Sequence, residues 1–136
     1  MAKRKAKPKY RVFVSHATAD KWVARMICEK IEAVGAATFR DDRDIEGGDA
    51  IPRILRDELL DSDEFLLLLT PTSANRPWVT IEIGAAWAKD MRIVPICYQC
   101  SAEMIPATIR DNKAFDLNDL DRYLVELVGR IAGRTP

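Results

Sequence analysis

The sequence is poor in the residues that form metal sites and disulfide frameworks. It contains one histidine and three cysteines. An odd cysteine count in a chain with ample apolar residues favours a reducing compartment, so we expect a cytoplasmic protein. Cys97 and Cys100 form a C-x-x-C pair, but a structural zinc site needs four ligands, and only Cys28 and His16 remain to complete one. We therefore expect no metal site, and no redox role for this pair.

Long hydrophobic runs are also missing. The uniformly apolar stretch from Phe65 to Leu69 is far shorter than the roughly 20 residues that cross a membrane. No apolar stretch follows the charges at the N-terminus, as it would in a secretion signal. We therefore predict neither a membrane span nor export.

The chain has no net charge, because 21 basic and 21 acidic residues cancel. Five of the basic residues lie in an acid-free leader, residues 1–9, which has no apolar anchors and is predicted to be disordered. The remaining chain holds 16 basic against 21 acidic residues. Nucleic acid is therefore disfavoured as a partner.

What the chain does have is apolar material for one core, since 48% of its residues are hydrophobic, and residues 10–136 are predicted to form one domain. Short strand-like runs alternate with amphipathic stretches, which predicts a parallel sheet with helices on both faces. Pro95 inside the fourth run argues for an edge position or a break in pairing. The predicted strands are residues 10–15, 36–40, 65–69, 92–97 and 113–117. The predicted helices run from an N-cap at Asp20 to Gly35, over 51–60, from Trp78, and over 120–131.

A ligand site can be located if the strand order is flavodoxin-like, 2-1-3-4-5. The switch point then lies between the first and third strands, and a ligand binds beyond their carboxyl ends. Two loops would form the crevice, SHATAD at residues 15–20 and TPTSANRPW at residues 70–78. Trp78 and Glu82 are four residues apart near the start of a helix, so both would face this crevice.

Three stretches of the sequence resemble the TIR domain family (Toll/interleukin-1 receptor/resistance). YRVFVSHATAD resembles the first box of the family, FRDDRDIEGGDAI resembles strand B with the BB loop, and LLLLTPTSANRPWVTIEIGAA resembles strand C, its Ser-rich loop and the W-x-x-x-E helix. They occur in the family's order and spacing across residues 10–131. The resemblance implies an α/β, flavodoxin-like fold with a five-stranded parallel sheet in the order 2-1-3-4-5.

The enzymatic branch of that family uses the glutamate of W-x-x-x-E as its catalytic residue. The resemblance therefore implies catalysis by Glu82, stacking of nicotinamide on Trp78, and substrate contacts for Ser15 and His16. The chemistry is plausible, because breaking the N-glycosidic bond of NAD develops oxocarbenium character that a carboxylate stabilises, and an aromatic face suits a pyridinium ring. NAD would be the substrate, and no cofactor is expected.

The resemblance also implies roles for two loops. Arg43 in the BB loop and Ser73 in the Ser-rich loop are candidate substrate contacts, although Ser73 has no base partner for nucleophilic catalysis. We expect the BB loop to support self-assembly through TIR–TIR contacts, with a sensor domain or a partner chain as a further partner. Some enzymatic members carry an aromatic residue after the BB-loop glycines, where this chain has Asp49 and Ala50, so the level of activity stays open. The assembly candidates are Asp44, Ile45, Glu46, Gly47 and Gly48.

Several functions remain open at this stage. The first is an NAD nucleosidase that yields nicotinamide with ADP-ribose or a cyclic isomer, acting as an immune or signalling effector, for example in antiphage defence. The second is a non-catalytic adaptor, in which the BB loop and helix faces serve homotypic assembly. Separately, Glu82 could be an ordinary exposed helix residue. A nucleoside deoxyribosyltransferase-like enzyme shares the layout and a catalytic glutamate. A receiver domain is disfavoured, because Ser15 and His16 stand where its acidic pair would follow the first strand.

Overall fold

The structure is a computed structural model that describes residues 9–40, 53–74 and 77–134. Strands and helices alternate along the chain as predicted, and short 3-10 segments follow β1, β4 and β5. The strands are β1 (Arg11–Ser15), β2 (Ala37–Arg40), β3 (Glu64–Leu69), β4 (Arg92–Cys97) and β5 (Phe115–Asp116), and the helices are α1 (Lys21–Ala33), α2 (Arg53–Leu60), α3 (Pro77–Ala88) and α4 (Leu120–Arg134).

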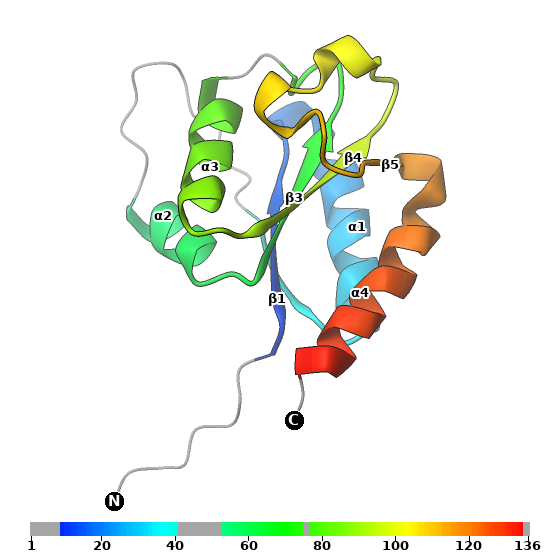
Figure 1. Cartoon of the computed structure of the whole chain (residues 1–136). Helices are drawn as coiled ribbons and strands as arrows, with labels where there is room; N and C mark the ends of the chain where they lie inside the picture. The colour runs from blue at the N-terminus through cyan, green and yellow to red at the C-terminus, as the bar shows by residue number, and fades with distance from the viewer. Residues whose placement is uncertain (1–8, 41–52, 75–76, 135–136) are drawn as a thin grey trace, which may run out of the picture.

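The five strands form one sheet in the order β2-β1-β3-β4-β5, and every neighbouring pair is parallel. This confirms the predicted topology. Parallel neighbours require crossover connections. Helices α1, α2 and α3 supply them between the first four strands, and two 3-10 segments lie in the connection from β4 to β5. Helices α1 and α4 cover one face of the sheet, and α2 and α3 cover the other (Figure 1).

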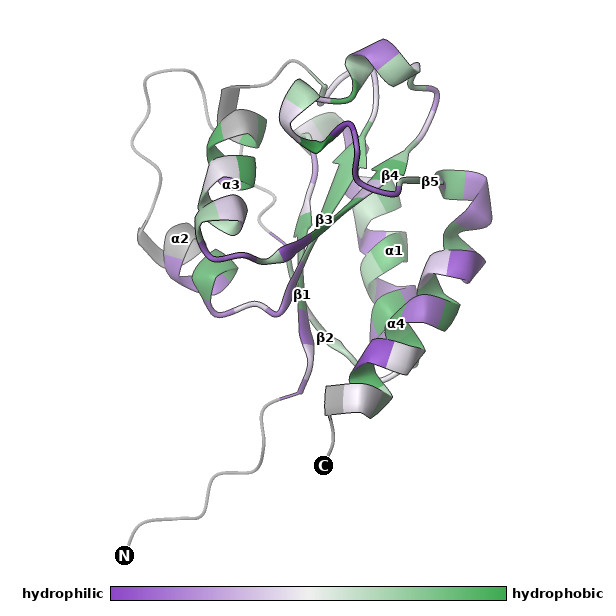
Figure 2. Ribbon diagram, in the orientation of Figure 1, coloured by the Kyte–Doolittle hydropathy of each residue, from purple (hydrophilic) through white to green (hydrophobic). Residues whose placement is uncertain are grey.

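Each face of the sheet has its own core, because successive strand residues point to opposite sides. Val12 and Val14 of β1 pack with α1 and α4, whereas Phe13 packs with α2 and α3. All six residues of β3 are buried, as expected for a strand covered on both faces. The central strands accordingly carry the apolar colour in Figure 2. Ser15, two residues after Phe13, belongs to the α3 side of the sheet.

The predicted end of α1 at Gly35 is confirmed, whereas Asp20 at its start does not cap the helix with its side chain. Gly35 follows the helix with φ 106, a left-handed conformation that favours glycine, and this confirms the predicted stop. Asp20 occupies the N-cap position, but its carboxylate makes no capping hydrogen bond. It accepts a hydrogen bond from Thr70 instead, so this side chain connects two loops.

The edge position suggested by Pro95 is wrong, because β4 lies between β3 and β5. The suggested break in pairing is present on one side only. Strand β4 pairs with β3 along its whole length but with β5 only at Ile96 and Cys97. The carbonyl of Ile93 accepts a hydrogen bond from the Asn112 side chain on the side of β4 that faces β5. Backbone groups two residues apart in a strand point to the same side, so those of Pro95 also face β5. Strand β5 does not pair with β4 at Pro95, so the missing N–H of Pro95 breaks no ladder hydrogen bond.

The last elements differ from the sequence prediction in length. Strand β5 has two residues instead of the five predicted over 113–117, and α4 continues past residue 131 to Arg134. Among the described residues, none of the helices has the length and apolar character needed to cross a membrane.

Candidate active site

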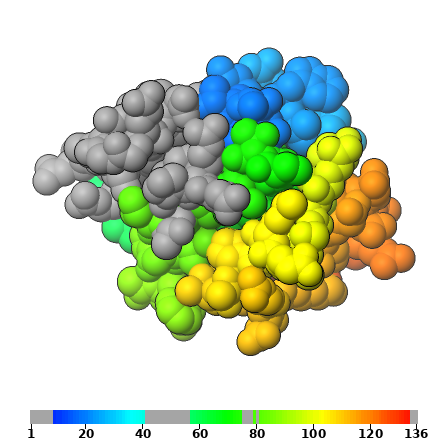
Figure 3. Space-filling model, turned by 90° about the horizontal axis from the view of Figure 1, so that it is seen from above, coloured from blue at the N-terminus to red at the C-terminus, as the bar shows by residue number. Residues whose placement is uncertain are grey.

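The carboxyl ends of β1, β3 and β4 meet at one edge of the sheet, which Figure 3 views from above. The Thr70 hydroxyl donates to an Asp20 carboxylate oxygen at 2.6 Å, and this bond joins the loop after β1 to the loop after β3. The backbone N–H of Tyr98, after β4, donates to the Leu69 carbonyl at 2.9 Å. The two loops predicted to form a crevice are therefore adjacent.

Glu82 lies on the face of α3 that packs against the sheet, together with Val79, Ile83 and Ala86. Its side chain is 6% exposed. The alternative that Glu82 is an ordinary exposed helix residue is therefore wrong. Burial of a carboxylate is costly unless it is hydrogen-bonded, so a charged group at this position requires partners.

Ser15, the last residue of β1, provides one of these partners. Its hydroxyl donates to Oε1 of Glu82 at 2.6 Å, and Ser15 is itself 3% exposed. The contact joins residues 67 positions apart in the sequence. It connects the carboxyl end of a central strand to the inner face of α3, at the edge where the switch point predicted a ligand.

His16 is buried beside this pair, with 5% of its surface exposed. Its Nδ1 atom lies 2.7 Å from the carbonyl oxygen of Ala17. A carbonyl oxygen only accepts, so Nδ1 carries a proton and donates. This bond orients the ring within the loop. Among the residues that the structure describes, no cluster of three or more histidine, cysteine, aspartate or glutamate side chains could hold a metal ion.

Ser73 shapes the loop after β3. Its hydroxyl donates to the Leu68 carbonyl at 2.9 Å and accepts from the Thr70 backbone N–H at 2.9 Å, and the residue is 0% exposed. The Thr70 hydroxyl in turn accepts from the backbone N–H groups of Thr72 and Ser73. A contact between Ser73 and a substrate would require this loop to open.

The remaining site candidates are described only in part or not at all. Trp78 lies in the first turn of α3, one turn before Glu82, and its side chain is outside the described part of the structure. The BB-loop residues also lie outside the described residues; these are Arg43, Asp44, Ile45, Glu46, Gly47, Gly48, Asp49 and Ala50.

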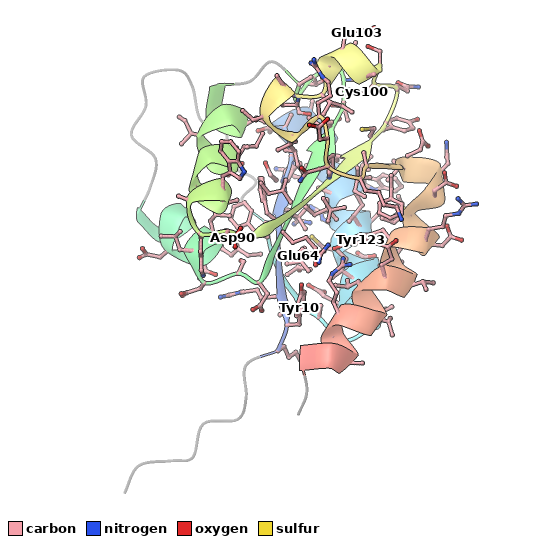
Figure 4. The ribbon with its side chains drawn as sticks, in the orientation of Figure 1. Tyr10, Glu64, Asp90, Cys100, Glu103 and Tyr123 are labelled. Carbon is pink, nitrogen blue, oxygen red and sulfur yellow. The ribbon has the colours of Figure 1, made fainter. Side chains whose placement is uncertain are left out.

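A second buried carboxylate, Glu64, was not singled out from the sequence. It starts β3, is 0% exposed, and accepts hydrogen bonds from Tyr10 at 2.7 Å and Tyr123 at 2.6 Å. Arg130 makes a bidentate ion pair with it, Nε to Oε1 at 2.7 Å and Nη2 to Oε2 at 2.9 Å. Figure 4 shows Tyr10 and Tyr123 on either side of Glu64, beside α4. We refer to these four residues as the Glu64 cluster.

The Glu64 cluster lies at the amino end of β3, away from Glu82. Burial, followed by the negative charge of Glu64, raises the pKa of both tyrosines above the ordinary range. The sequence carried a weak signal: Tyr123, Leu127 and Arg130 share one face of α4, and polar groups on the apolar face of a helix need hydrogen-bond partners when buried.

Cys97 and Cys100 are free thiols at the carboxyl edge of β4, and Figure 4 labels Cys100 there. Burial, followed by the proximity of Cys100 and Asp116, raises the pKa of Cys97 to about 11. The Cys100 sulfur lies 3.5 Å from that of Met104. A thiol in this state is a poor nucleophile near neutral pH.

Comparison with known proteins points to one family. The model of the TIR domain family matches residues 12–128. The metazoan TIR-STING receptor from C. gigas is similar with TM-score 0.68 and 20% identity, covering 93% of this chain and 42% of that one. The same receptor in complex with 2',3'-cGAMP has a TM-score of 0.66 and 19% sequence identity, and the match covers 89% of this chain and 41% of that one. A third match is to the TIR domains of the activated Roq1 resistosome, which directly recognizes the pathogen effector XopQ. Its TM-score is 0.53 and its sequence identity 18%, and it covers 93% of this chain and 85% of that one.

These likenesses support the fold at low sequence identity. The chain spans about two fifths of the length of the TIR-STING receptor. No curated protein sequence matches it significantly.

Proposed function

Because the chain belongs to the TIR domain family, we propose that it is an NAD nucleosidase whose catalytic residue is Glu82. The observation that carries this proposal is the burial of the Glu82 carboxylate at the carboxyl edge of the sheet, hydrogen-bonded to Ser15. A buried acid in a ligand-binding position of an α/β sheet is the type of group that active sites use.

The chemistry needs one carboxylate. The bond between the ribose C1′ and the nicotinamide nitrogen breaks, and both bonding electrons go to the nitrogen, so nicotinamide leaves neutral and without a proton. Positive charge then develops on the ribose, and the Glu82 carboxylate stabilises it electrostatically and through the ribose hydroxyls. Water adds its oxygen to C1′ and loses a proton to give ADP-ribose. Attack by an adenine nitrogen instead gives a cyclic isomer.

Several properties belong to the same proposal. His16, buried beside the Ser15–Glu82 pair, is the proposed contact to the ribose or a phosphate, and Trp78, one helical turn from Glu82, is proposed to stack on nicotinamide. We propose a cytoplasmic signalling or immune role, with activation by self-assembly. The TIR domains of the Roq1 resistosome and the greater length of the TIR-STING receptor support assembly and an additional sensor domain or partner chain.

A non-catalytic adaptor is the second candidate, and one feature of α3 favours it. Two large apolar side chains face outward from this helix, with Ile81 51% and Trp87 64% exposed. Glu82, the one acidic residue of the helix, points inward. An exposed apolar helix face suits contact with another protein. The two functions are compatible, because assembly could complete the catalytic site.

The test is to incubate the protein at high concentration with NAD, with and without a crowding agent, and to measure the released nicotinamide by chromatography. We expect release by the wild type and a loss of at least about 100-fold in a folded Glu82→Ala variant, the usual cost of removing one electrostatic catalytic group. Glu126→Gln, which changes an exposed glutamate on α4, should retain activity. An assembled wild type that releases no nicotinamide would leave the adaptor function.

A further inference from the structure

We propose that Ser15 is a positioning residue for Glu82: its hydroxyl orients the carboxylate and keeps it ionised, in place of binding the substrate. The catalytic consequence rests on the proposed function. The contact itself is a property of the folded chain and can be tested without any substrate.

The geometry favours a charge-assisted hydrogen bond. The distance from Ser15 Oγ to Glu82 Oε1 is 2.6 Å. Neutral hydroxyl bonds cluster near 2.7–2.8 Å, whereas bonds from a hydroxyl to a carboxylate fall at about 2.5–2.7 Å. The 2.6 Å distance fits the second type of bond.

The burial of both residues makes this bond hard to replace with water. Ser15 is 3% exposed and Glu82 is 6% exposed. A hydroxyl donor also stabilises the charge without cancelling it. Glu64 provides the contrast, because its buried charge is neutralised by the bidentate Arg130 pair. The Ser15 hydroxyl itself brings no positive charge to Glu82.

The backbone of β1 fixes the position of the Ser15 hydroxyl. Ser15 ends β1 in parallel register with Leu67 of the fully buried strand β3. The next residues of the loop are held by the Asp20–Thr70 hydrogen bond. A donor on a central strand keeps its direction better than one on a free loop, as a catalytic carboxylate requires.

The first test is a carboxyl carbon NMR titration of Glu82, with the signal assigned by its loss in Glu82→Gln. We expect Ser15→Ala to raise the titration midpoint by about one pH unit, because the hydrogen bond favours the charged form. Ser15→Thr, which keeps the hydroxyl, should restore the midpoint. Ser62→Ala is the matched control, since the Ser62 hydroxyl is equally buried but bonds the Glu58 carbonyl. The other titratable groups that the structure describes at this edge are the same in all variants; they are His16, Asp20, Cys97, Tyr98, Cys100 and Asp116.

The second test is the steady-state kinetics of nicotinamide release. A positioning role predicts that Ser15→Ala lowers kcat about tenfold with little change in KM, moves the acid limb of the kcat profile to higher pH, and is rescued by threonine. A raised KM with unchanged kcat would instead indicate a substrate contact and overturn the proposal. An unchanged Glu82 midpoint in Ser15→Ala overturns it whatever the activity. A wild type that releases no nicotinamide refutes the proposed function, while the titration still decides the role of Ser15.

Discussion

At the scale of single residues, the two buried carboxylates among the described residues are held in different ways. Glu64 has a bidentate arginine and two tyrosine hydroxyls as partners, so its charge is neutralised. Glu82 accepts from the Ser15 hydroxyl, which carries no charge. The first arrangement fastens α4 to the sheet. The second ties the inner face of α3 to the end of β1.

The Glu64 cluster gives a prediction about stability. Arg130→Met leaves Glu64 buried without its cation, and breaking a buried pair in this way costs about 3–5 kcal/mol of unfolding free energy. Urea denaturation followed by circular dichroism would measure the loss. Lys113→Met is the control, because the Lys113–Glu126 pair is exposed, with 70% and 41% of the two side chains accessible. Exposed pairs contribute little, and equal losses in the two variants would contradict the prediction.

Sequence spacing predicts which residues approach the site but not which atoms bond. The switch-point rule brings Ser15, His16 and Glu82 to one edge of the sheet, and the structure has them there, all buried. The Ser15–Glu82 bond depends on the rotation of α3 against β1, which no local pattern encodes. The partners Glu64 and Arg130 are 66 residues apart, and the ion pair depends on how α4 docks.

At the scale of elements, prediction succeeded where the apolar period was strong. The strand order and the uniformly apolar β3 agree with the structure. The length of β5 was overestimated, because its pairing with β4 covers only Ile96 and Cys97. The edge position inferred from Pro95 was wrong for a related reason. Because β5 is short, Pro95 has no pairing partner on that side, although β4 is a central strand.

The turn that ends α1 gives a prediction at this scale. Gly35 has φ 106, and a methyl group added there would meet nothing within 4 Å. Gly35→Ala therefore introduces backbone strain without a clash, and we expect a loss of about 1–2 kcal/mol. Gly129→Ala is the matched control in α4, where the added methyl also meets nothing and alanine favours the helix by up to about 1 kcal/mol. The thermal unfolding temperature should fall in Gly35→Ala and rise in Gly129→Ala. A change of the same sign in both variants would refute this account.

At the scale of the whole molecule, the Glu64 cluster and the proposed active site lie at opposite ends of β3. Strand β3 begins at Glu64 and ends beside the loop of Thr70 and Ser73, and six residues of strand span roughly 20 Å. Substitutions in the Glu64 cluster should therefore change unfolding without changing the geometry around Glu82. The two edges can be examined separately.

The whole molecule should lose stability in alkaline solution. The pKa of Tyr123 is raised by burial and by Glu64, so above about pH 10 this tyrosine ionises in the unfolded chain but stays protonated in the folded chain. Cys97, with a pKa of about 11, acts in the same direction from about pH 9. The unfolded state then binds fewer protons than the folded state, and the unfolding free energy falls as pH rises.

The decline should approach about 1.4 kcal/mol per pH unit for each fully shifted group. Urea denaturation at a series of pH values from 8 to 11 would measure it. Tyr123→Phe removes one titrating group and one hydrogen bond to Glu64. We expect this variant to be less stable at neutral pH but to decline less steeply above pH 10. A decline as steep as that of the wild type would show that the alkaline loss arises elsewhere in the chain.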